Sequence, residues 1–357
     1  MKYYLTIAVA VSFCCQLCFC QQKISITPKP GKVFIELGEN KQIINADFLV
    51  SNSSTDTFTL TKLSLSVFDR SDNLIYSRFL DNNGTAPSIH LVPGRIFNGV
   101  SAQLIFNPFT EFTASMPLHK LVYEWTFEDG SNQEIKGRSI ISPVPYVQKE
   151  TFIFPLKGRL LVYDAHDLYA HHRRFDFEFA PIKGLGFTAN FMRYAYDFVL
   201  IDSGRQFKTD GKKNEDYISW GKPVYAVAAG KVIYVAASHK DDHKFDIPSL
   251  ANNPMELYGN CLAIQHGDES VSIYGHLRDK SISLKNGDMV KAGQEIGSVG
   301  ASGSSFFPHL HFEVRTSIKH SAEGLPSYFS NVVLLEGTQK IKLKSGLVET
   351  GNIIEAK

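Results

Sequence analysis

Two histidines stand two residues apart near the carboxyl end of the chain, at His309 and His311. They belong to a run from Phe306 to Val314 whose apolar residues predict a core strand. Side chains two residues apart on a strand point to the same face, so both imidazoles can reach one pocket. Burying such a pair without partners is unfavourable, which favours a metal ion or hydrogen-bond partners beside it. One ring could then bind the metal ion while the other moves protons or stabilises charge.

Three other positions carry groups of the same chemistry. His276 ends a predicted strand directly after Gly275, and a glycine there lets a substrate or a loop approach closely. Asp197 interrupts an apolar, aromatic run, where a carboxylate needs a metal ion, a cation or several hydrogen-bond donors. His171 and His172 are adjacent, and neighbours on a strand point to opposite faces, so we expect at most one of them to face a given site.

These groups match the needs of a hydrolytic zinc site. Zinc in such sites takes three ligands from histidine, aspartate or glutamate and leaves the fourth position to water, which becomes a nucleophile near neutral pH. One histidine of the His171-His172 pair, Asp197, and either His309 or His311 would supply the three ligands. The remaining histidines could move protons or stabilise the oxyanion. The residues therefore predict a zinc-dependent hydrolase.

The first half of the chain has the pattern of strands and turns. Apolar and polar side chains alternate with a period of two in three runs, which marks half-buried strands. The runs are Leu63 to Val67, Val100 to Phe106 and Leu121 to Phe127. We expect an immunoglobulin-like β-sandwich over residues 23–146, without catalytic residues, because its two histidines, His90 and His119, stand alone. Pro143 and Pro145 then mark a stiff linker.

The second half of the chain is again rich in short strands. Residues 223–235 have the pattern of two strands joined at Ala229-Gly230, and Asn286-Gly287 is typical of a tight hairpin turn. No segment beyond the first 20 residues has a long helical period. We therefore predict an all-β fold, with a β-rich catalytic domain over residues 147–330. A C-terminal β extension over residues 331–357 carries no catalytic group that we identify.

The first 20 residues have the pattern of an export signal. Lys2 gives a basic start, and the apolar run from Leu5 to Phe19 is shorter than the roughly 20 residues that a membrane-spanning helix needs. Cleavage after Cys20 would release the protein into the periplasm or the medium; in the alternative, Cys20 becomes a lipid anchor. Of the five cysteines only Cys261 lies beyond this segment, so we expect no intramolecular disulfide and no cysteine metal cluster.

The overall charge is close to neutral. The chain has 37 lysines and arginines against 36 aspartates and glutamates, which gives a net charge of +1. Such a balance provides no global attraction to nucleic acid or to an anionic membrane. We therefore expect no nucleic-acid partner, and the sequence leaves the oligomeric state open.

Six segments of the second half, in one order, resemble the motifs of a known family. They are the run from Trp220 to Val232, Gly259-Asn260, His266-Gly267, the run from Tyr274 to Leu277, the run from Gly287 to Gly297, and the run from Gly300 to Val314. Together they resemble the lysostaphin-like (LytM-type) zinc metallopeptidases of peptidase family M23. The resemblance implies a barrel-sandwich-hybrid-like β fold, a zinc cofactor, and hydrolysis of peptide bonds in peptidoglycan stem peptides or cross-links.

The resemblance also implies roles for single residues. By position, His311 resembles the zinc-ligand histidine of the family, while His309 and His276 resemble its two catalytic histidines. Asp197 resembles the aspartate ligand, because it precedes the Gly-x-Pro-Val strand at a workable distance. The family usually places its first ligand four residues before that aspartate. This chain has Arg193 there, which cannot bind zinc while it is protonated.

Three arrangements follow from this departure. In the first, His172 or His171 supplies the missing ligand from upstream, and we choose His172. In the second, the site has lost a ligand, and the domain binds the cell wall or regulates another hydrolase. In the third, His172 and Asp176 restore the four-residue spacing, but they lie about 20 residues further from the Gly-x-Pro-Val strand. The predicted site therefore has His172, Asp197 and His311 as zinc ligands and His276 and His309 as catalytic residues.

The glycine-rich repeats also resemble those of biotinyl and lipoyl carrier domains. Such carriers attach their cofactor to a lysine at an exposed hairpin tip, usually beside a methionine. No Met-Lys pair occurs beyond the first 20 residues. The carrier interpretation would also leave the histidines unexplained, so we favour the peptidase.

Overall fold

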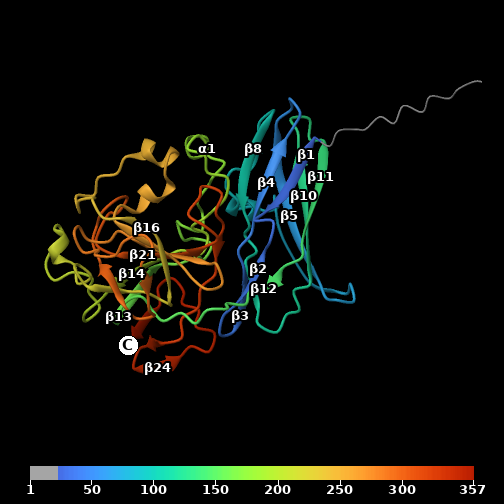
Figure 1. Ribbon diagram of the computed structural model, residues 1–357. Helices are drawn as coiled ribbons and strands as arrows, with labels where there is room; N and C mark the ends of the chain where they lie inside the picture. The colour runs from blue at the N-terminus through green and yellow to red at the C-terminus, as the bar shows by residue number, and fades with distance from the viewer. Residues whose placement is uncertain (1–22) are drawn as a thin grey trace, which may run out of the picture.

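The computed structural model describes residues 23–357, which form two strand-rich units that lie side by side (Figure 1). The predicted all-β fold is confirmed as far as a mostly β chain, since the described residues contain 25 strands and only short helices. The predicted export signal over residues 1–20, and with it Cys20, lies outside the described residues. Within residues 23–357, no helix is both long and apolar enough to cross a membrane.

Three small sheets make up the N-terminal unit. The first has the order β1 (Ile24–Lys29), β4 (Asp47–Asn52) and β8 (Ser101–Phe106). The second has the order β11 (Glu134–Ile141), β10 (Lys120–Glu128), β5 (Phe58–Phe68) and β6 (Leu74–Asp81), with β7 (Ile96–Phe97) beside β5. The third has the order β12 (Val144–Pro145), β2 (Phe34–Leu37), β3 (Lys41–Ile44) and β9 (Glu111–Thr113). The three alternating runs of the sequence fall on β5, β8 and β10, as predicted.

The core of this unit follows from that alternation. Every second side chain of β5 and β10 points inward, and Leu63, Leu65 and Trp125 have no exposed surface. The ring of Phe48 from β4 lies edge-on against Trp125, with centroids 4.9 Å apart, and so joins the first sheet to the second. The unit therefore has a hydrophobic core of its own, and Asp47 is the residue directly before Phe48.

An eleven-stranded sheet organises the C-terminal unit. Its order is β19 (Met289–Val290), β16 (Gly230–Ala236), β17 (Cys261–Gln265), β18 (Val271–Gly275), β21 (Leu310–Arg315), β14 (Tyr196–Leu200), β13 (Gly158–Asp164), β25 (Ile353–Ala356), β23 (Val332–Glu336) and β24 (Gln339–Lys342), with β22 (Gly324–Leu325) beside β21. A separate pair is formed by β15 (Pro223–Tyr225) and β20 (Glu295–Ser298). The short helices are α1 (Ala180–Lys183) and the 3₁₀ helices η1 (Ser88–Leu91), η2 (Asn214–Asp216), η3 (Ile247–Ala251) and η4 (Pro254–Tyr258).

Strand pairing departs from the sequence-based expectation in one place and extends it in another. Residues 223–235 do contain two strands, but β15 pairs with β20 and β16 pairs with β17, so the two do not form a hairpin. The tail after residue 330, which the sequence predicted only as a β extension, has three strands, and β25 pairs with β13. This pairing covers an edge of the main sheet that would otherwise expose unpaired backbone groups.

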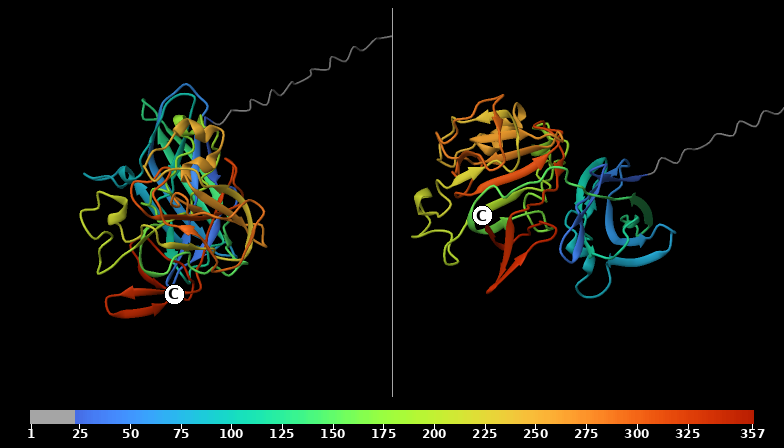
Figure 2. Two further views of the ribbon diagram at one scale, coloured as in Figure 1. Left: turned by 60° about the vertical axis from the view of Figure 1, so that its left-hand side comes forward. Right: turned by 60° about the horizontal axis from the view of Figure 1, so that its bottom comes forward.

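The two units pack against each other, as the two further views show (Figure 2). Leu104 of β8 belongs to the same hydrophobic cluster as Phe177 and Phe187 of the C-terminal unit. The predicted linker is itself part of a sheet, because β12 runs parallel to β2. The chain therefore enters the C-terminal unit from a fixed position against the N-terminal unit.

Candidate metal centre

The carboxylate of Asp197 lies at the centre of four histidines. Its Oδ1 is 3.2 Å from Nδ1 of His311, 3.3 Å from Nε2 of His309 and 3.7 Å from Nε2 of His172. Its Oδ2 is 3.9 Å from Nε2 of His171. Both predicted metal-binding histidines therefore lie within 4 Å of the predicted aspartate.

Strand register explains how three of the chemical groups meet. Asp197 on β14 lies opposite His311 on β21, and His311 in turn lies opposite Gly275, the residue before His276, on β18. His309 directly precedes β21, and its two-residue spacing from His311 places both rings on the Asp197 side of the sheet. The sheet therefore collects these groups from three segments that are far apart in the sequence.

His171 and His172 come from a turn, not from a strand, so the expectation that at most one of them faces the site is wrong. Their ring centroids are 3.8 Å apart, and both Nδ1 atoms face the carboxylate of Asp164, at 2.7 Å and 3.2 Å from its Oδ2. A turn does not alternate its side chains as a strand does. The two rings differ in burial, since 66% of the His171 side chain is exposed against 5% for His172.

Asp164 is a member of the cluster that the sequence did not reveal. It ends β13 and lies opposite Asp197 of β14 in the strand register. Asp164, His171, His172 and Asp197 offer ligand atoms that all lie within 4.8 Å of one another, so this group could hold a metal ion. The only signal in the sequence was an aspartate at the end of an apolar run, and its relation to Asp197 depends on a pairing between strands.

Hydrogen bonds fix the tautomers of the two predicted catalytic histidines. Nδ1 of His276 is 2.8 Å from the carbonyl oxygen of Ser302, and Nδ1 of His309 is 2.8 Å from that of Phe307. A carbonyl oxygen only accepts, so each Nδ1 carries a hydrogen and each ring keeps Nε2 for other partners. The rings of His276 and His309 have centroids 4.9 Å apart.

Burial and neighbouring charges set the protonation states. Burial lowers the pKa of His172 and of His311, which keeps both imidazoles in the neutral form that binds metal ions. Burial opposes the charge on Asp197, but His172 and His309 outweigh it and hold the pKa of Asp197 well below its usual range. For His309 the same carboxylate outweighs burial and raises the pKa. The centre thus combines neutral rings at His172 and His311 with an ionised carboxylate at Asp197.

The atoms around Asp197 are of the types that zinc binds, although His311 is not part of the group whose ligand atoms all lie within 4.8 Å of one another. Ligands at about 2.0–2.1 Å around a tetrahedral zinc ion lie about 3.3–3.4 Å from one another, and the 3.2 Å and 3.7 Å separations from Asp197 to His311 and His172 are close to that value. Nδ1 of His172 lies 3.2 Å from Oδ2 of Asp164, although neither atom makes a hydrogen bond of good geometry. Burial opposes the charge of Asp164, yet His171 and His172 lower its pKa to about 2, so it is ionised.

Two other residues from the ligand alternatives lie elsewhere. Arg193, at the usual ligand position of the family, points to the N-terminal unit, and its Nη1 donates to Oδ2 of Asp47. Asp176 accepts from the backbone N–H groups of Glu178 and Phe179. Within residues 23–357, no side-chain hydrogen bond or ion pair joins Asp176 to His172 or His311, whereas Asp197 lies within 4 Å of both histidines.

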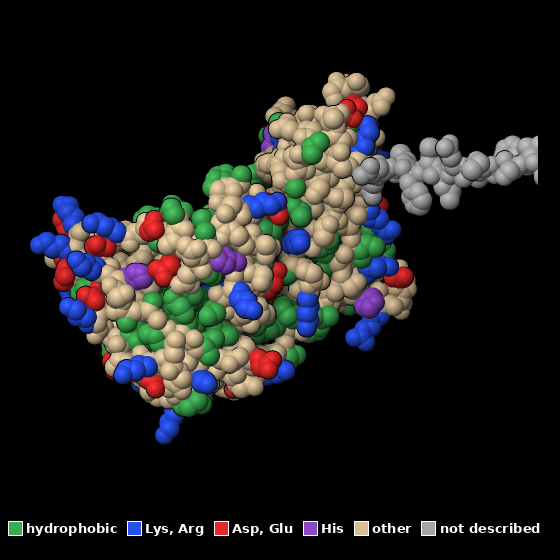
Figure 3. Space-filling view, turned by 45° about the horizontal axis from the view of Figure 1, so that its top comes forward, with side chains coloured by type: hydrophobic (Ala, Val, Ile, Leu, Met, Phe, Trp, Pro, Cys, Tyr) green, Lys and Arg blue, Asp and Glu red, His purple; other side chains and the backbone are tan. Residues whose placement is uncertain are grey.

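The histidines open into a cavity of about 780 Å³ with mostly apolar walls. Figure 3 views the molecule from the top, where hydrophobic side chains gather on the face of the C-terminal unit. The walls come from three segments and include Phe175, Ile182, Phe187, Leu250, Leu257, Phe306 and Phe307. Besides Asp197, none of the residues that line this cavity is an acid, a lysine or an arginine. An extended apolar ligand could therefore reach the histidines without burying a charge against these walls.

Comparison with known proteins identifies the family. The family described as "Peptidase family M23" matches residues 216–323. The lipoprotein NlpD of Yersinia enterocolitica is 34% identical over 97 residues, which are 27% of this chain and 80% of that protein. The chain belongs to peptidase family M23. Of the predicted site residues, the M23 match includes His276, His309 and His311, whereas His172 and Asp197 precede it.

Other M23 relatives share the same segment. The murein hydrolase activator NlpD of Escherichia coli is 33% identical over 97 residues, which are 27% of this chain and 21% of that protein. In the first three relatives the match spans 30%, 80% and 13% of their length. Among solved structures, the catalytic domain of lysostaphin from Staphylococcus simulans is 23% identical, with a TM-score of 0.26, over 47% of this chain and 88% of that chain.

Proposed function

We propose that this protein is a zinc-dependent endopeptidase that hydrolyses peptide bonds in peptidoglycan stem peptides or cross-links. The observation that carries the proposal is the convergence on Asp197 of His172 and His311, with His309 beside them. In this proposal His172, Asp197 and His311 are the three protein ligands. His276 and His309 are the catalytic residues. Zinc, when bound there, supplies a Lewis acid and lowers the pKa of a water molecule.

The two catalytic histidines have distinct roles in this proposal. His309 presents Nε2 toward Asp197, so it can take the proton of the attacking water at that atom and pass it to the leaving amine. His276 keeps its Nδ1 hydrogen on Ser302 and presents Nε2 to the cavity, where the neutral ring can accept a hydrogen bond from the attacking water or from the substrate. Both assignments need the rings held in one orientation, and their carbonyl partners provide it.

The substrate class rests on the relatives and stays a proposal. Lysostaphin is named as an antimicrobial peptidase and the Escherichia coli protein as a murein hydrolase activator. A peptide of the cell wall is the substrate class that the resemblance to peptidase family M23 implies. Several relatives are named lipoproteins, which agrees with our proposal of export to the periplasm or the medium and with a lipid anchor at Cys20 as an alternative.

A second candidate function is a catalytically degenerate domain that binds the cell wall or regulates another hydrolase. Two observations favour it. The Escherichia coli relative is named as an activator, and Arg193 occupies the position where the family usually has its first ligand. The proximity of His172 to Asp197 supports the enzyme, because in this proposal His172 supplies from another segment the ligand that Arg193 cannot.

We also propose the domain organisation that the sequence suggested. It has a signal peptide over residues 1–20, an immunoglobulin-like β-sandwich over 23–146, the peptidase domain over 147–330 and the C-terminal extension over 331–357. The N-terminal unit has a hydrophobic core of its own, which supports the boundary between residues 146 and 147. The pairing of β25 with β13 ties the extension to the peptidase sheet.

One experiment separates the two functions. The purified protein from residue 21 onward is assayed for zinc content and for release of soluble peptides from purified peptidoglycan. We expect one zinc ion per chain and digestion that a chelator abolishes and zinc restores. His311→Ala should lose both properties, while His90→Ala, a substitution in the N-terminal unit, should keep both. Full zinc content without digestion of any peptidoglycan would refute the enzyme and favour the regulatory function.

A further inference from the structure

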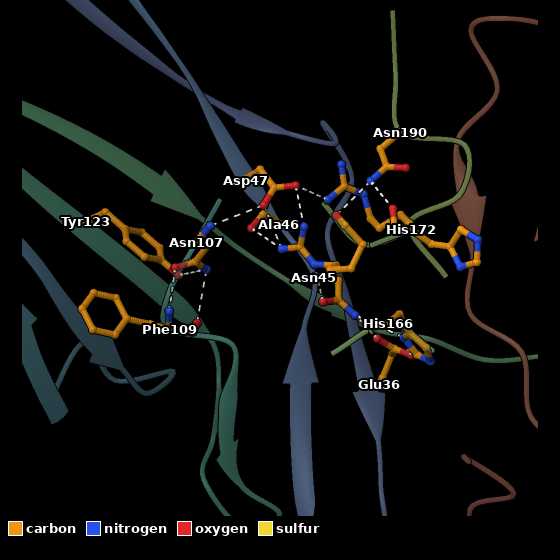
Figure 4. Close-up of polar contacts among 12 residues, drawn as sticks. Glu36, Asn45, Ala46, Asp47, Asn107, Phe109, Tyr123, His166, His172 and Asn190 are labelled. Atoms are coloured by element: carbon orange, nitrogen blue, oxygen red, sulfur yellow. Dashed lines mark hydrogen bonds and ion pairs between the residues drawn. The ribbon is translucent and has the colours of Figure 1, made fainter. Parts of the chain in front are cut away.

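A buried carboxylate of the N-terminal unit lies between two buried arginines of the C-terminal unit (Figure 4). Oδ2 of Asp47, at the start of β4, accepts from Nη1 of Arg173 at 2.8 Å and from Nη1 of Arg193 at 2.5 Å. Its Oδ1 is 2.8 Å from Nη2 of Arg173. All three side chains have no exposed surface. A two-point contact of this kind holds a guanidinium in one orientation.

Further bonds fix Arg173, and with it the turn that carries His172. Nε of Arg173 donates to Oδ1 of Asn45 at 2.7 Å, and Nη2 donates to the carbonyl oxygen of Ala46 at 3.1 Å. From the opposite side, Nδ2 of Asn190 donates to the carbonyl oxygens of His172 and Arg173, at 3.2 Å and 3.0 Å. The backbone next to the proposed ligand is therefore held between the N-terminal unit and the segment before β14.

A second chain of contacts runs from the N-terminal unit to the segment of Asp197. Asn45 Nδ2 donates to Oε1 of Glu36 at 2.8 Å, and Oε2 of Glu36 is 3.2 Å from Nδ1 of His166. Nε2 of His166 is 3.0 Å from the hydroxyl oxygen of Tyr196, the residue directly before Asp197. Two proposed zinc ligands thus each have a sequence neighbour that the N-terminal unit contacts through buried polar groups.

We propose that Asp47 is a positioning residue of the metal centre. Through this residue the N-terminal unit holds the proposed zinc ligand His172 in place. The inference rests on the proposed zinc site. His172 lies on a turn and not in the sheet, so no strand register fixes its ring. Without the Asp47 carboxylate, two guanidiniums would stay buried without their counter-ion, and moving Arg173 toward water would displace His172.

Other contacts between the units provide a matched control. Oε1 of Glu39 accepts from the backbone N–H and the hydroxyl of Ser345, at 2.9 Å each. This contact also joins the N-terminal unit to the C-terminal unit, but Ser345 lies in the tail, far in the sequence from every proposed ligand. Replacing the Glu39 carboxylate with an amide should weaken this contact between the units without moving His172.

The test compares Asp47→Asn and Glu39→Gln in the protein from residue 21 onward. Zinc affinity is measured by competition with a chromophoric chelator, and folding of the metal-free protein by circular dichroism and urea denaturation. We expect Asp47→Asn to bind zinc about tenfold or more weakly, since outer partners of metal ligands commonly contribute 10- to 100-fold. Glu39→Gln should bind zinc as the unchanged protein does.

A second variant covers the case in which Asp47→Asn does not fold. Arg173→Lys keeps the buried positive charge but loses the two-point contact and the bond from Nε to Asn45. It should also weaken zinc binding about tenfold, with circular dichroism of the metal-free protein unchanged. Unchanged zinc affinity in the variants that fold would overturn the role of Asp47 alone. An unchanged parent protein that binds no zinc would overturn the proposed function, and the inference with it.

Discussion

Asp197 and His311 lie opposite each other on neighbouring strands, with Oδ1 of the carboxylate 3.2 Å from Nδ1 of the imidazole. Their positions are tied to backbone hydrogen bonds between β14 and β21, so this half of the centre is rigid. The other half, His172, sits on a turn and depends on side-chain contacts. We therefore expect zinc affinity to be sensitive to substitutions of the residues that contact the turn of His172.

The two adjacent histidines should respond differently to removal. His172→Ala should lower zinc affinity by more than about 100-fold, because loss of a ligand exceeds the effect of an outer partner. His171→Ala should change it much less, since 66% of that side chain is exposed. Chelator competition on both variants checks the assignment. Equal losses in the two variants, or a larger loss in His171→Ala, would assign the ligand to His171 instead.

Asp164 should act on zinc through His172. Asp164→Asn removes the charge that faces Nδ1 of His172 and His171, and we expect zinc affinity to fall about 10- to 100-fold. Once His172→Ala has removed the ligand, adding Asp164→Asn in a double variant should lower zinc affinity little further. If the two losses add fully, Asp164 acts independently of His172, and the proposed orientation of the ligand fails.

The free energy of unfolding of the metal-free protein should depend on pH through the protonation of His276. Burial lowers the pKa of this imidazole well below its usual range, so the folded protein stays unprotonated where the unfolded chain binds a proton. Stability should therefore fall as the pH drops below about 6.5, by up to about 1.4 kcal/mol per pH unit. His276→Gln should lack this contribution. Urea denaturation at pH 7.5, 6 and 5 in a chelator measures it, and parallel curves for the two proteins would contradict it.

The apolar cavity should favour substrates with bulky apolar side chains near the cleaved bond. Phe306 lines the cavity beside His309 and is 93% exposed, so its replacement should not affect folding. Phe306→Ser should raise KM for such a peptide about tenfold, because burying a phenylalanine contributes about 1.5–3 kcal/mol. Phe79→Ser, an exposed phenylalanine of the N-terminal unit, is the matched control. A KM that does not change, or a lower kcat alone, would exclude Phe306 as a contact for the substrate.

The sequence by itself determined the chemistry of the chain and its family. The two-residue spacing of His309 and His311 was enough to place both rings on one side of a strand, because alternation is a local property of extended backbone. An aspartate within the aromatic run around Asp197 indicated a buried carboxylate with a partner, since burial demands one. The ordered motifs around His276 then identified the M23 family, which the comparisons confirm.

Only the tertiary structure decided what surrounds those groups. The adjacency of Asp164 to Asp197 depends on which strands pair, and the shared orientation of His171 and His172 depends on a turn. Asp47 lies more than 120 residues from its partner Arg173 along the chain. A residue pattern reports on local periodicity, whereas pairing between distant segments is set by the packing of the whole chain. For that reason the carboxylates around His172 could be found only in the folded protein.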